Sequence, residues 1–356
     1  MKHYNIDPIN SLGADFNIIY GERSNGKSYQ LKHKMGVIKY LETGSKFILV
    51  RRFRDELTTD KIEKYFDDVD VEKLTDGKYN IISVYRKSIY LSNMDMETFK
   101  VTRGEKIGYA ISLSQEQNYA GSSFLDVNDI IFEEFMSRGA YLYNEPSKLM
   151  NLYATIDRKR KTTRLWLVGN SISRVCPYIY EWGLTDVFKR LKEGEMDVVN
   201  IKSSDDDIVK LAIEYCEPTG VSSHTIGLNK EMINTGAWDS RPQPHLPKKL
   251  NCYKRLYRFI FSYQNFTFIC ELLADKETNY LCWYIYPYYK KIKDNILVIT
   301  DRIDPSPLYQ RDIYNITINN PLLKNILSTF REDKIFYATD LCGTDFKQVI
   351  DFTIRR

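Results

Sequence analysis

The sequence lacks the features that mark a disulfide-stapled, zinc-binding or membrane-spanning protein. Its six cysteines form no C-x-x-C pair and its four histidines show no H-x3–5-H spacing, so we expect no zinc site. Such cysteine usage fits a reduced, cytoplasmic setting. No run of about 18 uncharged apolar residues occurs, which argues against a membrane-spanning helix. The first residues carry no apolar segment, so no secretory signal peptide is expected.

Internal repeats and low-complexity tracts are also missing, and the bulk composition is that of an ordinary globular protein. The 356 residues are 43% hydrophobic, enough for one large domain or two smaller ones. Charge is uneven along the chain. Residues 247–356 hold 17 Lys and Arg against 12 Asp and Glu, whereas the first 246 residues hold 34 against 35. The surplus is compatible with a polyanionic partner and equally with a solvated basic face.

A glycine-rich loop follows the first apolar run, Phe16–Tyr20, which predicts a buried strand. The two glycines of this loop allow a tight turn that aims backbone N–H groups at phosphates. Lys27 offers a charge to the β- and γ-phosphates, and Ser28 offers a hydroxyl to Mg²⁺. Residues 29–40 lack proline and predict a helix whose N-terminal end faces the phosphates. The strand before and the helix after favour a site for ATP with Mg²⁺ over a chance loop. The residues expected to bind it are Gly21, Glu22, Arg23, Ser24, Asn25, Gly26, Lys27, Ser28 and Tyr29.

Two adjacent carboxylates end a second apolar run at Ile130–Glu134. A strand parallel to the first would deliver them at the same sheet edge as the phosphate loop. Because successive side chains on a strand point in opposite directions, the two acids take different roles. We assign Glu133 to the metal and Glu134 to the attacking water. The alternative is a strand end with two solvated acids.

Three further positions are candidates for contact with phosphate. Arg158 is the first candidate, and Arg160 the second, for an arginine finger that binds the γ-phosphate in a neighbouring subunit. Both lie in a basic turn. Such fingers contribute on the order of 10³–10⁵ in rate. A basic surface turn or a nucleic-acid contact is the alternative. Asn170 ends another predicted strand and is either a polar sensor of the γ-phosphate or a plain strand end. Arg54 is a candidate for a subunit boundary.

Alternation of strands and helices predicts an α/β domain with a parallel sheet over residues 1–200. A region with linker composition follows at 201–250, with four prolines and three glycines from Pro218 to Pro247 and a helix expected from Ser203 to Cys216. Residues 251–356 predict a small α+β domain. Strands are expected at residues 46–50, 79–90, 106–113, 164–170, 259–263, 266–273, 280–286 and 334–338, with helices at 148–157 and from about 344.

The motifs together resemble the DNA-packaging ATPases (encapsidation proteins) of small phi-29-type tailed phages. The resemblance covers about the first 200 residues and rests on the order of the motifs. It departs from the family pattern at Glu133, where Asp is usual. The motifs that carry it are Gly21–Ser28, Leu49–Phe53, Ile130–Phe135, Arg158–Arg160 and Leu167–Asn170.

The resemblance implies a P-loop ATPase motor domain of the ASCE type followed by a small ribonuclease-H-like domain. It implies a homo-oligomeric ring, with a pentamer as the expected size, that docks on the portal of a prohead in the host cytoplasm and drives double-stranded DNA inward. A structural packaging RNA is a further partner in this family, and no membrane is involved. The rivals are a P-loop helicase or phosphotransferase, and a nucleotide-gated nucleic-acid-binding protein that hydrolyses ATP poorly.

The C-terminal domain is expected to bind nucleic acid or the portal rather than to cut. A metal nuclease needs several converging carboxylates, and the strands predicted at 259–263 and 280–286 carry none. Asp275, Asp301 and Asp340 lie only near breaks or ends. Tyrosines and basic residues interleave at 253–258 and 288–293, where they could meet phosphates or form the exposed rim of a sheet.

Overall fold

The computed structural model describes residues 4–137, 141–171, 173–202, 207–220, 241–289, 296–300, 310–312 and 334–354. These residues form two compact units. The first holds the described residues up to 220 except 173–175, and the second holds residues 173–175 together with the described residues from 241 onward. Within this part of the chain, every helix is too short or too polar to span a bilayer.

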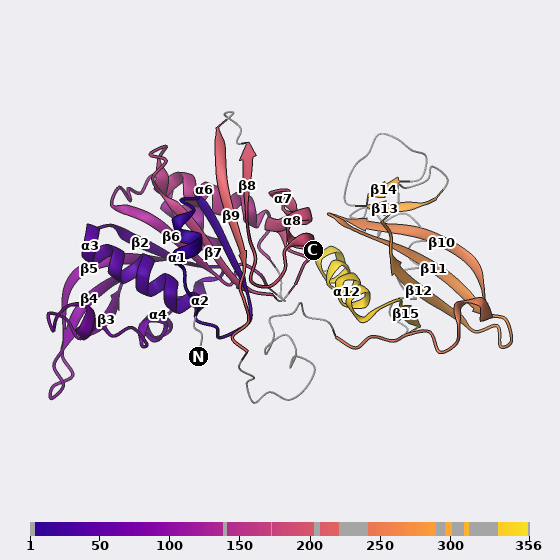
Figure 1. Ribbon diagram of the computed structural model, residues 1–356, viewed down its shortest axis with the longest axis horizontal. Helices are drawn as coiled ribbons and strands as arrows, with labels where there is room; N and C mark the ends of the chain where they lie inside the picture. The colour runs from indigo at the N-terminus through magenta and orange to yellow at the C-terminus, as the bar shows by residue number, and fades with distance from the viewer. Residues whose placement is uncertain are drawn as a thin grey trace. The chain divides into compact units, whose positions relative to one another are not determined.

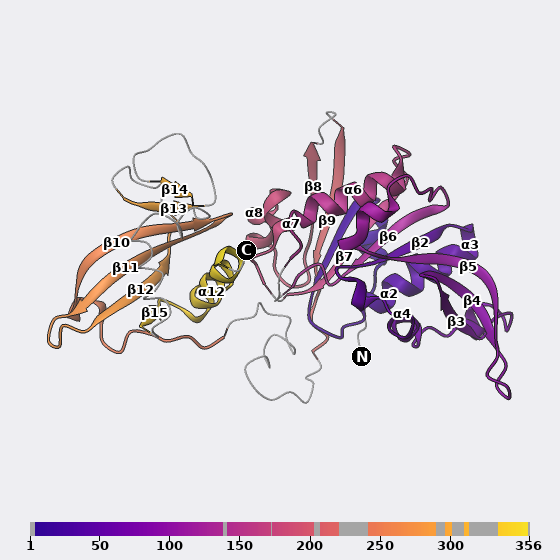
Figure 2. The same cartoon turned by 180° about the vertical axis from the view of Figure 1, so that it is seen from behind.

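The first unit is built on a nine-stranded sheet with the order β3-β4-β5-β2-β6-β7-β1-β9-β8 (Figures 1 and 2). The six strands from β5 to β9 in this order pair in parallel, and antiparallel hairpins extend both edges. The strands are β1 Phe16–Gly21, β2 Lys46–Arg51, β3 Ile81–Tyr85, β4 Ser88–Met94, β5 Val101–Ser112, β6 Val127–Glu133, β7 Arg164–Asn170, β8 Met196–Lys202 and β9 Ile208–Tyr215.

The inner strands of this sheet are covered on both faces. All six residues of β1 are buried, as are the last five of β6. Strand β7 lies between them, so the strand that carries the two acids is separated by one strand from the strand that leads into the glycine-rich loop. This confirms the predicted α/β architecture with a parallel sheet.

A continuous helical segment follows the glycine-rich loop. It comprises α2 Lys27–Gln30, the wider π-type turns of η1 Leu31–Ile38, and α3 Lys39–Thr43. Gly36 allows this segment to approach the sheet, because a Cβ there would lie 3.3 Å from the Phe47 ring. The other helices of this unit are α1 Asp7–Ser11, η2 Arg54–Glu56, α4 Thr59–Phe66, α5 Val71–Leu74, η3 Leu113–Tyr119, α6 Glu145–Asp157, α7 Pro177–Glu181 and α8 Thr185–Arg190.

The helix predicted up to Cys216 is wrong: residues 208–215 form β9. This strand pairs in parallel with β1 on one side and antiparallel with β8 on the other. Leu211, Ala212 and Ile213 are all buried, which a strand with covered faces permits. The free edge of β1 therefore overrides the local helix signal. The sheet continues beyond residue 200, where the sequence analysis ended the first domain.

The second unit contains a six-stranded sheet with the order β14-β13-β10-β11-β12-β15. Strands β10, β11 and β12 correspond to the three strands predicted between residues 259 and 286 and form an antiparallel meander, and β13 and β15 join it in parallel. The C-terminal helix packs on one face through Phe346, whose ring lies 5.2 Å from that of Phe268. It begins at Asp340, four residues before the predicted start. The elements are η4 Leu250–Cys252, β10 Tyr253–Tyr263, β11 Phe266–Asp275, β12 Leu281–Pro287, β13 Val298–Thr300, β14 Gln310–Asp312, β15 Ile335–Tyr337 and α12 Asp340–Ile354.

Candidate nucleotide site

The glycine-rich loop connects β1 to α2 at the carboxyl edge of the parallel sheet. Two of its glycines are required by the backbone. Gly21 has φ +146°, and a Cβ there would lie 3.1 Å from the Cys216 Cβ. Gly26 has φ +99°, a conformation that side chains disfavour, and it immediately precedes the first residue of α2. The loop therefore has the tight path that a phosphate cradle needs.

Lys27 is held inside the loop and is only 4% exposed. Its ammonium donates to Asn25 Oδ1 at 3.0 Å and to the carbonyl oxygen of Glu22. Burial lowers the pKa of Lys27, while nearby groups, including the carboxylates of Glu133 and Glu22, oppose that shift. The cation thus sits between the loop's own oxygens and the acid at the end of β6.

Glu133 comes together with Ser28, as the sequence predicted for a metal site. The Ser28 hydroxyl donates to Glu133 Oε2 at 2.8 Å, and the Tyr65 hydroxyl donates to Glu133 Oε1 at 2.7 Å. Burial raises the pKa of Glu133, and both hydrogen bonds and the charge of Arg51 oppose the rise. A hydroxyl and a carboxylate are hard oxygen donors of the kind that Mg²⁺ prefers, so these residues fit that ion.

Glu134 is the first residue beyond β6 and has a different environment. Its backbone adopts φ +58°, and its half-exposed carboxylate accepts a hydrogen bond from Arg51 Nη2 at 3.1 Å. Arg51 is the last residue of β2, the strand next to β6. The two neighbouring acids therefore differ in their surroundings, with Glu133 enclosed beside Ser28 and Glu134 open to solvent.

A buried ion pair behind Glu134 was missed by the sequence reasoning. Arg52 Nε and Nη2 donate to the two carboxylate oxygens of Glu145 at 2.7 and 2.9 Å. The same guanidinium donates to the carbonyl oxygens of Glu134 at 3.1 Å and Phe135 at 2.8 Å. The Tyr178 hydroxyl donates to Glu145 as well. The pair thereby fixes the chain that carries Glu134. An arginine directly after a predicted strand was the available signal.

One cavity of about 450 Å³ is lined by most of the residues that were predicted to bind or cleave the nucleotide. Gly21, Glu22 and Arg23 do not line it; the Glu22 carboxylate instead accepts hydrogen bonds from Thr219 N and Oγ1. Asn170, at the end of β7, does line it, together with several residues that sequence reasoning did not select. The lining residues are Ser24, Asn25, Gly26, Lys27, Ser28, Tyr29, Lys32, Arg51, Lys64, Tyr65, Asp68, Glu133, Glu134, Val168, Gly169 and Asn170.

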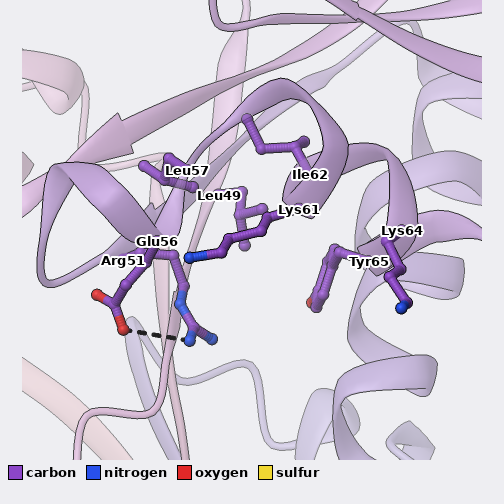
Figure 3. Close-up of a pocket in the computed structure, with 8 residues that line it drawn as sticks. All are labelled: Leu49, Arg51, Glu56, Leu57, Lys61, Ile62, Lys64 and Tyr65. Atoms are coloured by element: carbon purple, nitrogen blue, oxygen red, sulfur yellow. Dashed lines mark hydrogen bonds and ion pairs between the residues drawn. The ribbon is translucent and has the colours of Figure 1, made fainter.

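A second cavity of about 440 Å³ shares Arg51, Lys64 and Tyr65 with the first. In Figure 3, Tyr65 and Lys64 stand across it from Arg51 and Glu56, which are hydrogen-bonded at 3.3 Å. Its remaining lining residues are Leu49, Leu57, Lys61 and Ile62. The second cavity therefore adjoins the candidate nucleotide site at the end of β2 and at helix α4.

Arg158 and Arg160 lie at the other end of the strands. The Arg158 guanidinium donates to the carbonyl oxygens of Gly121 and Ser122 at 3.1 and 2.7 Å. Arg160 donates to several groups, among them the carbonyl oxygen of Val127, the first residue of β6, at 2.7 Å. Neither lines the cavity in its own subunit. Arg54, the candidate for a subunit boundary, is exposed at the start of η2.

The candidate acids of the second unit are engaged in local contacts. Asp275 pairs with Lys248 at 2.9 Å, and hydrogen bonds from Lys248 and from backbone amides lower the pKa of Asp275 to about 2. Asp340 accepts hydrogen bonds from Gln243 N at 2.8 Å and pairs with His245. Asp301 lies outside the described residues. No group of three or more potential metal ligands occurs in the described parts of the chain.

Comparison with known proteins adds a family and a fold. Residues 1–211 match the family of podovirus DNA encapsidation proteins (Gp16). The DNA packaging protein of Bacillus phage phi29 is 30% identical over 205 residues, 56% of each chain. That of Bacillus phage B103 is 30% identical over 194 residues, 53% of this chain and 55% of the relative. The match thus spans about half the length of these curated relatives. A chain of the bacteriophage phi-29 genome packaging motor assembly shares the fold, with a TM-score of 0.55 and 21% identity over 98% of this chain and 100% of the other.

Proposed function

We propose, because the chain belongs to the podovirus DNA encapsidation protein (Gp16) family, that it hydrolyses ATP to drive double-stranded DNA into a preformed phage capsid. The observation that carries this proposal is the meeting of two motifs, the phosphate loop and the adjacent acid pair, at one cavity. Ser28 of the phosphate loop contacts Glu133 at 2.8 Å, and Glu134 opens into the same space. These motifs are far apart in the sequence, so their convergence supports a site that binds and cleaves a nucleotide.

The proposed chemistry assigns one task to each side chain. Lys27 meets the β- and γ-phosphates with its charge, and the amides of the loop and of α2 bind phosphate oxygens. Ser28 and Glu133 hold Mg²⁺, which neutralises phosphate charge and helps to orient the nucleotide when it is bound. Glu134 orients the attacking water and accepts its proton. Asn170 lines the cavity from the end of β7, which supports the proposal that it reports on the γ-phosphate.

The proposed assembly is a homo-oligomeric ring, with a pentamer as the expected size, that docks on the portal of a prohead in the host cytoplasm. A structural packaging RNA is proposed as a further component. The relatives are DNA packaging proteins of Bacillus phages, which supports this assignment. In such a ring we propose that Arg158 acts on the neighbouring subunit's nucleotide. Arg158 does not line the cavity of its own subunit, which supports a role across a boundary, and Arg160 is the second choice.

The second unit is proposed to bind nucleic acid or portal without cutting. Lys254, Arg255, Leu256 and Tyr257 form an exposed run on β10, which supports a contact with phosphates. Asp275 and Asp340 are occupied by Lys248 and by His245, respectively. Two of the three candidate acids are therefore committed to local contacts.

Multiple-turnover phosphate release, measured with and without nucleic acid, tests the proposed function. A packaging motor should release phosphate faster when duplex DNA is added, and Glu134→Gln should abolish that stimulation. Stimulation by single strands alone would indicate a helicase, and the absence of turnover in the wild-type chain would indicate a nucleotide-gated binding protein. Either result would contradict the proposal.

A further inference from the structure

Tyr65 is the one aromatic hydroxyl that the described structure places on the metal-side acid. It comes from α4, a helix of the segment between β2 and β3, and reaches across to the end of β6. Its hydroxyl donates to Glu133 Oε1 at 2.7 Å, while Ser28 donates to Oε2 at 2.8 Å. The carboxylate is therefore held at both oxygens by two different elements.

The phenol is itself held in place from the helical segment behind the phosphate loop. The Lys32 ammonium lies 4.6 Å from the centre of the Tyr65 ring, donates to the Tyr65 carbonyl oxygen and pairs with Asp68. The ring also packs edge-on against Phe66 at 5.0 Å. These contacts make a defined donor site for one oxygen of Glu133.

The hydrogen bond from Tyr65 offsets a disadvantage of glutamate, compared with aspartate, as a metal ligand. Glutamate has one methylene and one rotatable bond more than aspartate, so its carboxylate has more orientations to lose when a metal binds. Groups that hydrogen-bond to metal ligands orient them, and their loss typically weakens metal binding roughly 10–100-fold. A hydrogen bond to Oε1 restricts the carboxylate and leaves the Oε2 side facing Ser28 and the cavity.

We propose that Tyr65 is a positioning residue for the carboxylate of Glu133. Its hydrogen bond holds this side chain, which is longer than aspartate, in an orientation that allows it to bind Mg²⁺. The proposal rests on the proposed ATP–Mg²⁺ site. It adds that the segment between β2 and β3 takes part in forming that site. Tyr65 does not touch the reacting atoms, so its effect should appear in the metal dependence of nucleotide binding.

The test uses the full chain and a fluorescent ATP analogue titrated at a series of Mg²⁺ concentrations and in EDTA. Tyr65→Phe should raise the Mg²⁺ concentration that gives half of the metal-dependent gain in analogue affinity by roughly tenfold. Analogue affinity in EDTA should remain at the wild-type value. Tyr40→Phe is the matched control, because it removes another phenol–carboxylate hydrogen bond, from Tyr40 to Glu105 at 3.1 Å, outside the cavity lining.

A double-mutant cycle separates positioning from a general structural role. Glu133→Asp shortens the acid, so that its carboxylate no longer reaches both partners. Adding Tyr65→Phe to that variant should then change the Mg²⁺ dependence by less than twofold. An unaltered Mg²⁺ dependence in Tyr65→Phe, or an equal loss with and without Glu133→Asp, would overturn the positioning role alone. If the wild-type chain shows no metal-dependent binding of the analogue, the proposed function fails together with it.

Discussion

Glu133 and Glu134 are adjacent in the chain, yet the end of β6 gives them opposite surroundings. Glu133 is the last residue of the strand, is 4% exposed and is bound by two hydroxyl groups. Glu134 follows with a left-handed backbone and keeps a half-exposed carboxylate beside Arg51. An enclosed acid suits a metal, and an open acid suits a water molecule that has to enter and react.

Two glutamine variants test this division of roles. Glu134→Gln should bind ATP with Mg²⁺ near the wild-type affinity but hydrolyse it on the order of 10²-fold or more slowly, because the group that takes the proton is lost. Glu133→Gln should instead weaken the Mg²⁺-dependent part of ATP binding. Equilibrium binding and single-turnover hydrolysis measure both. Normal turnover in Glu134→Gln, with hydrolysis stopped in Glu133→Gln, would reverse the assignment.

At the scale of elements, the Arg52–Glu145 pair joins three parts of the first unit. Arg52 follows β2, Glu145 begins α6, and the same arginine binds the carbonyl groups just after β6. Arg52 is 4% exposed and Glu145 is fully buried. Removal of one partner would leave a buried charge without its counter-charge, which is costly.

Arg52→Met should therefore lower the free energy of unfolding by roughly 3–5 kcal/mol. Urea denaturation followed by circular dichroism measures the loss. Lys78→Met provides a control, because it breaks the solvent-exposed pair between Lys78 and Glu105 and should change stability little. Replacing Glu145 by Leu in the Arg52→Met background should restore part of the loss. Wild-type stability in Arg52→Met would contradict a structural role for the pair.

The elements that the sequence predicted well are those with a strong local pattern. The apolar runs at β1, β2, β6 and β7 and the proline-initiated helix α6 carry their own signals, and the structure confirms them. Strand β9 does not, because Ile208–Tyr215 becomes a strand only through pairing with β1 and β8. Periodicity within a short window contains no information about such a partner.

The candidate site likewise contains residues that a local sequence pattern predicts and residues that it does not. The phosphate loop and the two acids have fixed spacing or a fixed place at a strand end, so their convergence followed from parallel-strand geometry. Arg51 reaches the site from the end of β2, and Arg52 and Tyr65 reach it from the segment that follows. Their partners lie 68 to 93 residues away in the chain. Hydrogen bonds over such separations depend on packing that no residue pattern here specifies.

At the scale of the whole molecule, the two candidate finger residues, Arg158 and Arg160, differ in the hydrogen bonds that their guanidinium groups make. Arg160 donates to Val127 O, Ile156 O and other groups where β6 begins and α6 ends. Arg158 has two exposed contacts, with Gly121 and Ser122. We therefore expect Arg160 to stabilise its own subunit and Arg158 to be the one that can reach a neighbour.

Mixing of inactive variants tests the action of Arg158 across a subunit boundary. Arg158→Ala and Glu134→Gln subunits should each be nearly inactive alone, because a finger acts on charge that develops in the transition state. Rings that contain both should regain part of the DNA-stimulated activity, since some interfaces then combine an intact Glu134 with an intact Arg158. Inactive mixed rings, once their formation is demonstrated, would exclude the role and leave Arg160 as the next candidate.

The second unit should bind DNA without cleaving it. Full-length Glu134→Gln protein, incubated with plasmid DNA and Mg²⁺ or Mn²⁺, should leave the plasmid supercoiled on a gel. The physical reason is that Asp275 and Asp340 are tied to Lys248 and His245 rather than directed at a shared metal position. Metal-dependent nicking that disappears in Asp275→Asn or Asp340→Asn would show a nuclease.

The central claim is that this chain uses ATP to move double-stranded DNA into a capsid. The most direct test mixes the purified protein with proheads of its own phage, the phage DNA and ATP. The amount of DNA that is protected from added nuclease is then measured. We predict protection that requires ATP and is lost with Lys27→Ala, which removes the phosphate-binding charge, and with Glu134→Gln. Protection that is independent of ATP, or that persists in both variants, would contradict the account.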